Sequence, residues 1–217
     1  MSNLRIWDAV EMTDPKYTKA VSFGRKFTSI DAMYQVKRAT EQFGPIGDGW
    51  GFKSDLEFVL TSDGERSETM AVVALTLWYK SASGSVIHKY GPVYGMNPVY
   101  APTKAGPKMD EDAPKKALTD ALTKALSYLG FSADVFLGKF DDNKYVQQAE
   151  RITASRRVGD SIVAMRKGLE NEDGGMILES WDELDETDKS VAWREFNTKE
   201  KARLRELMAA VRGSNSE

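Results

Sequence analysis

The chain contains no cysteine and a single histidine, His88, and these absences exclude most kinds of catalytic site. Without cysteine there is no disulfide framework and no thiolate chemistry. Without a second histidine, the sequence lacks the usual groups of a zinc site or of a Ser-His-Asp triad. We interpret His88, which lies in an expected strand, as a structural or surface residue. The sequence therefore predicts no catalytic residues and a protein that is not an enzyme.

The sequence also lacks a phosphate-binding loop of the Walker A type. Gly138-Lys139 comes nearest, but Ala133 stands where the motif has its first glycine, and Phe140 replaces its Ser or Thr. An ATP-driven mechanism is therefore not expected, and we predict no cofactor. Asp141-Asp142 could bind Mg²⁺, but two adjacent carboxylates alone do not make a site. We interpret the pair as a surface turn and predict no metal.

Long apolar runs are missing as well. The longest extends from Met70 to Tyr79, which is far short of the roughly 20 residues that a membrane-spanning helix needs. The segment from Met1 to Asp8 has no signal-peptide pattern of charge followed by an apolar stretch. We therefore expect a globular, cytoplasmic protein with no membrane partner.

The net charge of −3 argues against nucleic-acid binding through bulk charge, but the basic residues are unevenly distributed. Between residues 16 and 53, seven basic side chains stand against three acidic ones, a formal excess of +4. Between residues 151 and 217, 12 basic residues stand against 14 acidic ones. A phosphate-contacting surface is therefore expected near the N-terminus. Its candidate residues are Arg25, Lys26, Lys37, Arg38 and Lys53.

The first half of the chain predicts a helix followed by an antiparallel sheet. A helix from about Ile30 to Phe43 would be capped by Thr28 or Ser29, with Ile30, Met33, Tyr34 and Phe43 buried. Three strands, separated by turn signals, then form a meander of hairpins. In the first strand, Leu56, Phe58 and Leu60 alternate with Asp55, Glu57 and Val59 to give one buried face. The second strand, residues 70–79, is apolar on both faces and is expected at the centre, and the third covers residues 86–90.

The segment from Gly91 to Asp112 contains four prolines and three glycines before Asp112, and we expect a long irregular loop there. Its aromatic and basic residues interleave in a way that suits contact with single-stranded nucleic acid. The alternative is a flexible loop whose tyrosines have no such role. The residues concerned are Tyr94, Tyr100, Lys104 and Lys108.

Residues 114–130 predict an amphipathic helix with two distinct faces. Apolar residues such as Leu118, Leu122 and Leu126 recur on one stripe, and Lys116, Asp120, Lys124 and Ser127 follow one another on the opposite face. Asp112 can cap the start, and Gly130 can end the helix in the left-handed conformation. The lysines could bind a repeating polyanion, or the charged face could simply be solvated.

The chain after residue 146 reads as helical and charged. We expect a long helix from Tyr145 to Leu169 and two or three short helices between Met176 and Arg212. Their small core would contain Trp181, Leu184, Val191, Trp193, Phe196 and Leu204. The sequence thus predicts two regions, a core of residues 1–146 and a helical C-terminal region of residues 147–217. The predicted class is α+β, with the meander packed on the amphipathic helix.

Two ordered patterns in this core resemble the single-strand annealing proteins, namely the eukaryotic ring-forming recombination mediator and its bacteriophage relatives of the Sak and Erf type. The first is Ser29-Ile30-Asp31 followed by Thr40-Glu41-Gln42-Phe43-Gly44 and Gly49-Trp50, which leads into the meander. The second is Thr119-Asp120-Ala121-Leu122-Thr123-Lys124-Ala125-Leu126, which matches the family's Thr-Asp-small-Leu-x-basic-Ala-Leu helix. The resemblance covers roughly residues 5–146, and the C-terminal region is similar to the variable tail of the phage members.

The resemblance implies a protein that binds single-stranded DNA and anneals complementary strands without ATP, as a ring or helical filament. Lys124 matches the basic position of the helix motif, and Lys115 and Lys116 match the basic run before it. Ser127 departs from the family, which often has a further basic residue there. A phage protein of this kind would act in the cytoplasm of a bacterial host. Its C-terminal region could dock a phage exonuclease or a host single-strand-binding protein.

Two alternatives remain open from the sequence. The protein could protect single-stranded DNA without annealing it, in which case the same phosphate contacts would be present. It could also be an oligomeric adaptor whose acidic C-terminal helices recruit replication or nuclease partners.

Overall fold

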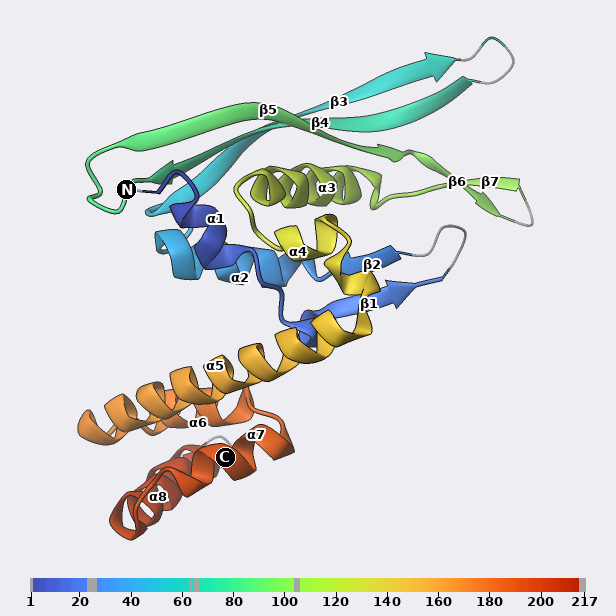
Figure 1. The fold of residues 1–217 in the computed structure, drawn as a ribbon. Coiled ribbons are helices and arrows are strands. Elements are labelled where there is room, and N and C mark those ends of the chain that lie inside the picture. Colours follow the sequence, from blue (N-terminus) through green and yellow to red (C-terminus); the bar gives the residue numbers. More distant parts are fainter. Residues whose placement is uncertain (1, 23–26, 63, 65–66, 104–105, 215–217) are drawn as a thin grey trace. The chain divides into compact units, whose positions relative to one another are not determined.

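The computed structural model describes residues 2–22, 27–62, 64, 67–103 and 106–214. The chain divides into two compact units, Met1–Asn143 and Lys144–Glu217, and each is described by itself (Figure 1). The division falls at the start of the long helix α5 (Asn143–Glu170). Helices and antiparallel strands are mixed in the first unit and the second is helical, so the predicted α+β class is confirmed.

The elements of the first unit follow the predicted order of helix, three-stranded meander and helix, with short additions. In chain order they are α1 (Arg5–Val10), η1 (Pro15–Tyr17), β1 (Thr18–Val21), β2 (Phe27–Ile30), α2 (Ala32–Phe43), β3 (Trp50–Ser62), β4 (Ser67–Lys80), β5 (Ile87–Pro98), β6 (Tyr100–Thr103), β7 (Gly106–Met109), α3 (Ala113–Tyr128), α4 (Ala133–Phe136) and η2 (Lys139–Asp141).

The main sheet has the order β3-β4-β5 with antiparallel pairing throughout, so the central position predicted for β4 is confirmed. Ala71, Val73, Leu75 and Leu77 alternate along β4 and are buried on one face. Helix α3 packs on this face against β4 and β5, as Figure 1 shows, and its buried alanines repeat every fourth residue. Small side chains at this spacing let the helix backbone approach the sheet closely.

Helix α2 begins later than predicted and exposes one residue that was expected to be buried. Asp31 caps it by accepting a hydrogen bond from the Met33 N–H at 2.7 Å, whereas the expected caps Thr28 and Ser29 belong to β2. Tyr34 is buried as predicted, together with Gln35 and Ala39. The prediction for Met33 is wrong, since its side chain is 68% exposed. Met33 lies roughly 200° around the helix from Gln35 and so faces away from the core.

The prediction of a buried face on β3 is also wrong. Leu56, Phe58 and Leu60 alternate as expected, but their side chains are 46%, 59% and 70% exposed. Strand β3 is at the edge of the sheet, and α3 covers β5 and β4 instead. An alternating pattern identifies the face that can be buried, but it does not show that another element covers it.

The prediction of an irregular loop between Gly91 and Asp112 is wrong as well, because β5 continues to Pro98 and a hairpin of β6 and β7 follows. Gly91 and Pro92 fall where the pairing of β5 with β4 shifts between Leu75 and Leu77. The missing N–H of Pro92 therefore costs no regular ladder hydrogen bond, and the strand continues past it. The glycines and prolines of this segment mark a bulge and a turn within strands.

The second unit consists of α5, α6 (Gly174–Asp182), α7 (Glu186–Arg194) and α8 (Thr198–Ser214). Its core contains Leu184, Phe196 and Leu204 as predicted, with Val158, Met165 and Ile177 added. Trp181 and Trp193 are partly buried and meet edge to face, with ring centroids 5.4 Å apart. The prediction for Val191 is wrong, since it is 46% exposed while the adjacent Ala192 turns into the core. No helix of the described residues is long and apolar enough to cross a membrane.

Candidate nucleic-acid interface

Helix α3 forms where its sequence predicts, and residues at its two ends set where it begins and stops. Pro114 lies in the first turn, and the chain leaves the helix at Gly130, whose φ of +101° is the expected left-handed conformation. The expected side-chain cap from Asp112 is not made. Asp110 borders the helix start instead, accepting a hydrogen bond from the Asp112 N–H at 3.2 Å.

An open groove of about 380 Å³ lies between α3 and the junction of β2 with α2. Its α3 wall presents charged and hydroxyl side chains, among them Lys116 and Asp120 of the predicted polar face, and its other wall is the start of α2. The N-terminal ends of α2 and α3 both border it, and such ends favour anions because their N–H groups point outward. The lining residues are Ile30, Ala32, Asp112, Lys115, Lys116, Thr119, Asp120 and Thr123.

The two lysines of the groove differ in their surroundings. Lys115 is exposed and forms no ion pair with any described residue. Lys116 donates to Asp110 Oδ2 at 2.6 Å, although more than half of its side chain is exposed. This hydrogen bond from the ammonium group holds the pKa of Asp110 below its ordinary value. A phosphate that binds Lys116 must therefore compete with the Asp110 carboxylate.

The two aspartates of the groove balance the formal charge of the two lysines. Asp120 turns toward the edge of β5, where its carboxylate accepts from the Met96 N–H at 3.3 Å and lies 3.5 Å from Lys124 Nζ. Lys124 also donates to the carbonyl of Tyr94 at 3.2 Å. Lys124, which the resemblance matches to the basic position of its helix motif, thus lies along the β5 edge and does not line the groove.

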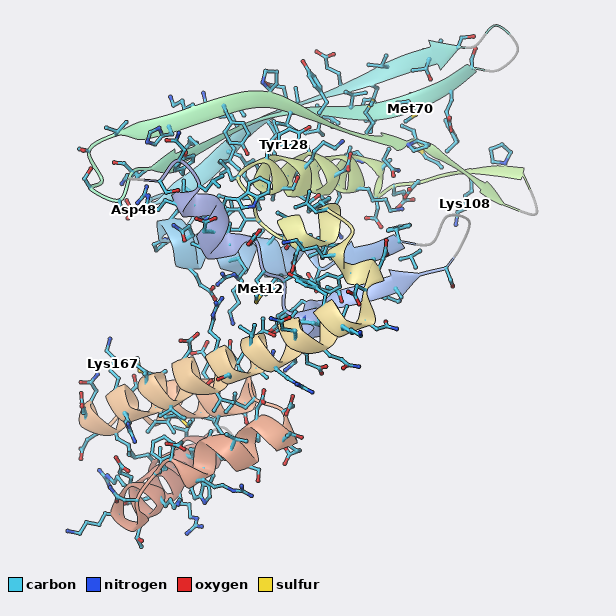
Figure 2. The ribbon with its side chains drawn as sticks, in the orientation of Figure 1. Met12, Asp48, Met70, Lys108, Tyr128 and Lys167 are labelled. Atoms are coloured by element: carbon cyan, nitrogen blue, oxygen red, sulfur yellow. The ribbon has the colours of Figure 1, made fainter. Side chains whose placement is uncertain are left out.

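Several of the predicted DNA contacts lie away from the groove. Lys53 and Tyr94 are exposed on the sheet face that α3 does not cover, because their strand partners Thr76 and Ala74 alternate with the buried residues of β4. Tyr100 is exposed on β6. Lys108, which is labelled in Figure 2, is exposed on β7. In Figure 1 the β6–β7 and β1–β2 hairpins both extend from the same side of the unit as the start of α3.

The prediction that Arg38 contacts DNA does not fit its geometry. Its guanidinium donates to the carbonyl of Ala9 at 3.0 Å and to Glu41 at 2.6 Å, and only 17% of the side chain is exposed. Arg38 therefore fastens the end of α1 to α2. Lys37 is exposed on α2 but does not line the groove. Arg25, Lys26 and Lys104 lie outside the described residues.

Among the residues that line the groove, only Lys115 and Lys116 were predicted as DNA contacts, and Ile30, Ala32, Asp112, Thr119, Asp120 and Thr123 were not. Ile30 was expected in the core because the helix was predicted to start there. Asp31, a strong N-cap residue, was the available signal that α2 starts at Ala32. The threonines were visible in the helix motif at a spacing of four, next to Lys115, where one helix face repeats.

No cluster of three or more histidine, aspartate or glutamate side chains suited to a metal ion occurs within the described part of the chain. Neither a protein family model nor a curated protein matches this sequence. The geometry of the groove and the resemblance of the two sequence patterns therefore carry the functional argument.

Proposed function

We propose that the first unit binds single-stranded DNA in the groove beside α3 and anneals complementary strands without ATP. The observation that carries this proposal is the convergence of Lys115, Lys116 and two helix N-termini on one open groove. Lysines and helix N-termini contact phosphate oxygens and do not read bases, so this chemistry gives affinity that is independent of sequence. Bases of a strand held only by its backbone stay available for pairing.

The two projecting hairpins suggest how a strand could extend beyond the groove. Tyr100 on β6 and Lys108 on β7 add an exposed aromatic ring and an exposed positive charge to the hairpin that precedes α3, on opposite faces of it because Lys108 pairs with Ala101. Stacking of bases on aromatic rings adds affinity without sequence preference. We further propose that the protein works as a ring or helical filament in the cytoplasm of a bacterial host. The second unit would then dock a phage exonuclease or a host single-strand-binding protein.

Reversing both groove lysines, Lys115→Glu with Lys116→Glu, is expected to weaken single-stranded DNA binding by about 100-fold and to reduce the salt slope by about 2. The matched control reverses Lys53 and Lys89, which are exposed on the sheet face away from α3, and carries the same change of net charge. At moderate salt, where long-range charge interactions are screened, the affinity of the control for single-stranded DNA should fall by less than about 3-fold. Fluorescence anisotropy with a labelled oligonucleotide measures both. Equal losses in the two variants would reject the groove.

An annealing assay distinguishes the proposed annealing protein from one that only binds and protects single-stranded DNA. Complementary fluorescent oligonucleotides are mixed with the protein in the absence of a nucleotide cofactor, at low and at moderate salt. We expect protein-dependent acceleration that decreases as salt rises, because phosphate contacts release counterions. Tight binding without acceleration would favour a protective single-strand binder, and no binding would favour the adaptor.

Asp110→Asn is expected to strengthen DNA binding by about 3-fold at low salt, because it frees Lys116 for phosphate. The substitution keeps the size of the side chain and removes the carboxylate charge that competes for the lysine, and the remaining amide oxygen can still accept from the Asp112 N–H or from Asn97 Nδ2. The salt dependence should become slightly steeper, since one more cation takes part in phosphate contacts. Salt titrations of both proteins test this. In a Lys116→Ala background, Asp110→Asn should lose most of its gain in DNA affinity. A gain that persists unchanged would show that Asp110 does not act through Lys116.

A further inference from the structure

Strand β3 carries apolar side chains that the first unit leaves uncovered. Leu56, Phe58 and Leu60 are 46–70% exposed, yet they point to the same face of the sheet as the core residues of β4. Leu56 pairs with Val73 and Phe58 with Ala71, and these partners are only 3% and 0% exposed. Directly paired residues of antiparallel strands share a face. This face is therefore covered over β4 and open over β3 from Leu56 to Leu60.

The backbone of β3 is open along the same stretch. Strand β3 is an edge strand of 13 residues, so the N–H and C=O groups that point away from β4 have no strand partner in the described sheet. Proteins protect such edges with lysine, proline or a very short strand. Residues 54–62 contain neither lysine nor proline. A long edge with an apolar face is suited to pairing with another strand.

The sequence of this stretch is complementary to itself. Leu56-x-Phe58-x-Leu60 reads the same in both directions, so two antiparallel copies centred on Phe58 match like with like. Leu56 then lies opposite Leu60 of the second copy, and Phe58 lies opposite Phe58. On the other face, Glu57 lies opposite Val59, and Asp55 opposite Thr61, so no carboxylate faces another.

Neighbouring registers are worse for specific reasons. Centring the pair on Glu57 or on Leu56 places carboxylates of the two copies opposite each other, which is unfavourable in an antiparallel pair. Centring it on Val59 leaves Leu56 opposite Ser62 and breaks the apolar match. A shift of register is thus opposed both by charge and by loss of apolar contact.

We propose that β3 is the interface of a homodimer, in which two copies join their sheets edge to edge about a two-fold axis at Phe58. The partner on this edge is a second copy of the chain, because β3 is complementary to itself in its apolar pattern and in its charges. A two-fold symmetric interface requires a surface of this kind. The contact is independent of the proposed DNA binding, since it needs neither the groove nor its lysines.

Cysteine cross-linking tests the register, because the native chain has no cysteine to interfere. Phe58→Cys should cross-link to itself on mild oxidation or with a short bis-maleimide reagent. Leu56→Cys should not cross-link to itself, since the two positions are offset by four residues, roughly 13 Å along the strand. It should cross-link to Leu60→Cys when the two variants are mixed. Tyr128→Cys is the control for random collision, because Tyr128 is 63% exposed and Phe58 is 59% exposed.

Sedimentation measures the strength of the contact without nucleic acid. Phe58→Glu places two like charges opposite each other and should raise the dimer Kd by at least about 100-fold. Its far-UV circular dichroism should be unchanged, because the side chain is exposed in the unit. The proposal is overturned if the native protein stays monomeric up to about 100 μM. It is equally overturned if Phe58→Cys cross-links no better than Tyr128→Cys, as when other surfaces alone join the copies of a ring or filament or when another protein covers the strand.

Discussion

Replacing Gly95 with alanine is expected to destabilise the first unit by about 3 kcal/mol. Gly95 lies on β5 facing α3, where an added Cβ would be 2.1 Å from the Ala117 carbonyl oxygen and 2.3 Å from the Ala121 nitrogen. These are backbone atoms of a helix, so a change of side-chain rotamer cannot relieve the clash. The helix must move off the sheet, and the buried alanine stripe of α3 then loses its close packing.

Hydrogen exchange in the intact 217-residue chain measures this effect within α3 itself. Amides of residues 113–128 should exchange faster in Gly95→Ala, and the urea midpoint of the first unit should fall. Gly159→Ala is the control, because nothing lies within 4 Å of a Cβ there and the residue is inside helix α5. That change should stabilise the second unit by about 0.5–1 kcal/mol. Unchanged protection of α3 in Gly95→Ala would contradict the close approach of helix and sheet.

Asp134→Ala is expected to cost about 3 kcal/mol, because it removes the acceptor of a fully buried hydrogen-bond group. The Asp134 carboxylate accepts from the Thr13 N–H at 2.8 Å, from the Thr13 hydroxyl at 2.6 Å and from the Val135 N–H at 2.9 Å. Asp134 and Thr13 are both 0% exposed, so water cannot replace the lost acceptor. The pair fastens the segment after α1 to α4, although Asp134 comes 121 residues after Thr13 in the chain.

Thr13→Val separates the two kinds of contact. It removes the hydroxyl but keeps the shape and the backbone N–H, so we expect a smaller loss of about 1 kcal/mol. The double variant should lose less than the sum of the single losses, because both changes break the same interaction. Asp141→Ala, at an exposed aspartate of the same unit, should change stability by less than about 0.5 kcal/mol. Urea unfolding of all four proteins provides the comparison, and strict additivity would show that the contact carries little energy.

The groove illustrates how far sequence reasoning reached into the candidate site. Lys116 was placed on the polar face of a helix by periodicity, Lys115 was named from the family resemblance, and both line the groove. Lys124 lies on the same helix but belongs to the β5 edge, where it contacts the Tyr94 carbonyl. Periodicity assigns a residue to a face, whereas the neighbour of that face depends on how the sheet and the β2–α2 junction pack around the helix.

Arg38 and β3 both show that a local pattern does not determine whether a side chain is buried or exposed. Arg38 was predicted to be a surface cation because it lies in a basic stretch, but the carbonyl of Ala9, 29 residues earlier, binds its guanidinium. Leu56, Phe58 and Leu60 were predicted to be buried because they alternate, but α3 does not cover them. In both cases the deciding partner is distant in the chain, so no local pattern could reveal it.

The sequence by itself determined the α+β class, the meander with β4 at its centre, the amphipathic α3 and the helical second unit. These follow from local periodicity, turn residues and capping, which act over a few neighbouring residues. The tertiary structure alone decided which apolar face stays open, which lysines share a groove, and that Asp134 bonds Thr13. Those outcomes depend on contacts between residues far apart in the chain, where packing and burial select among the faces that the local pattern offers.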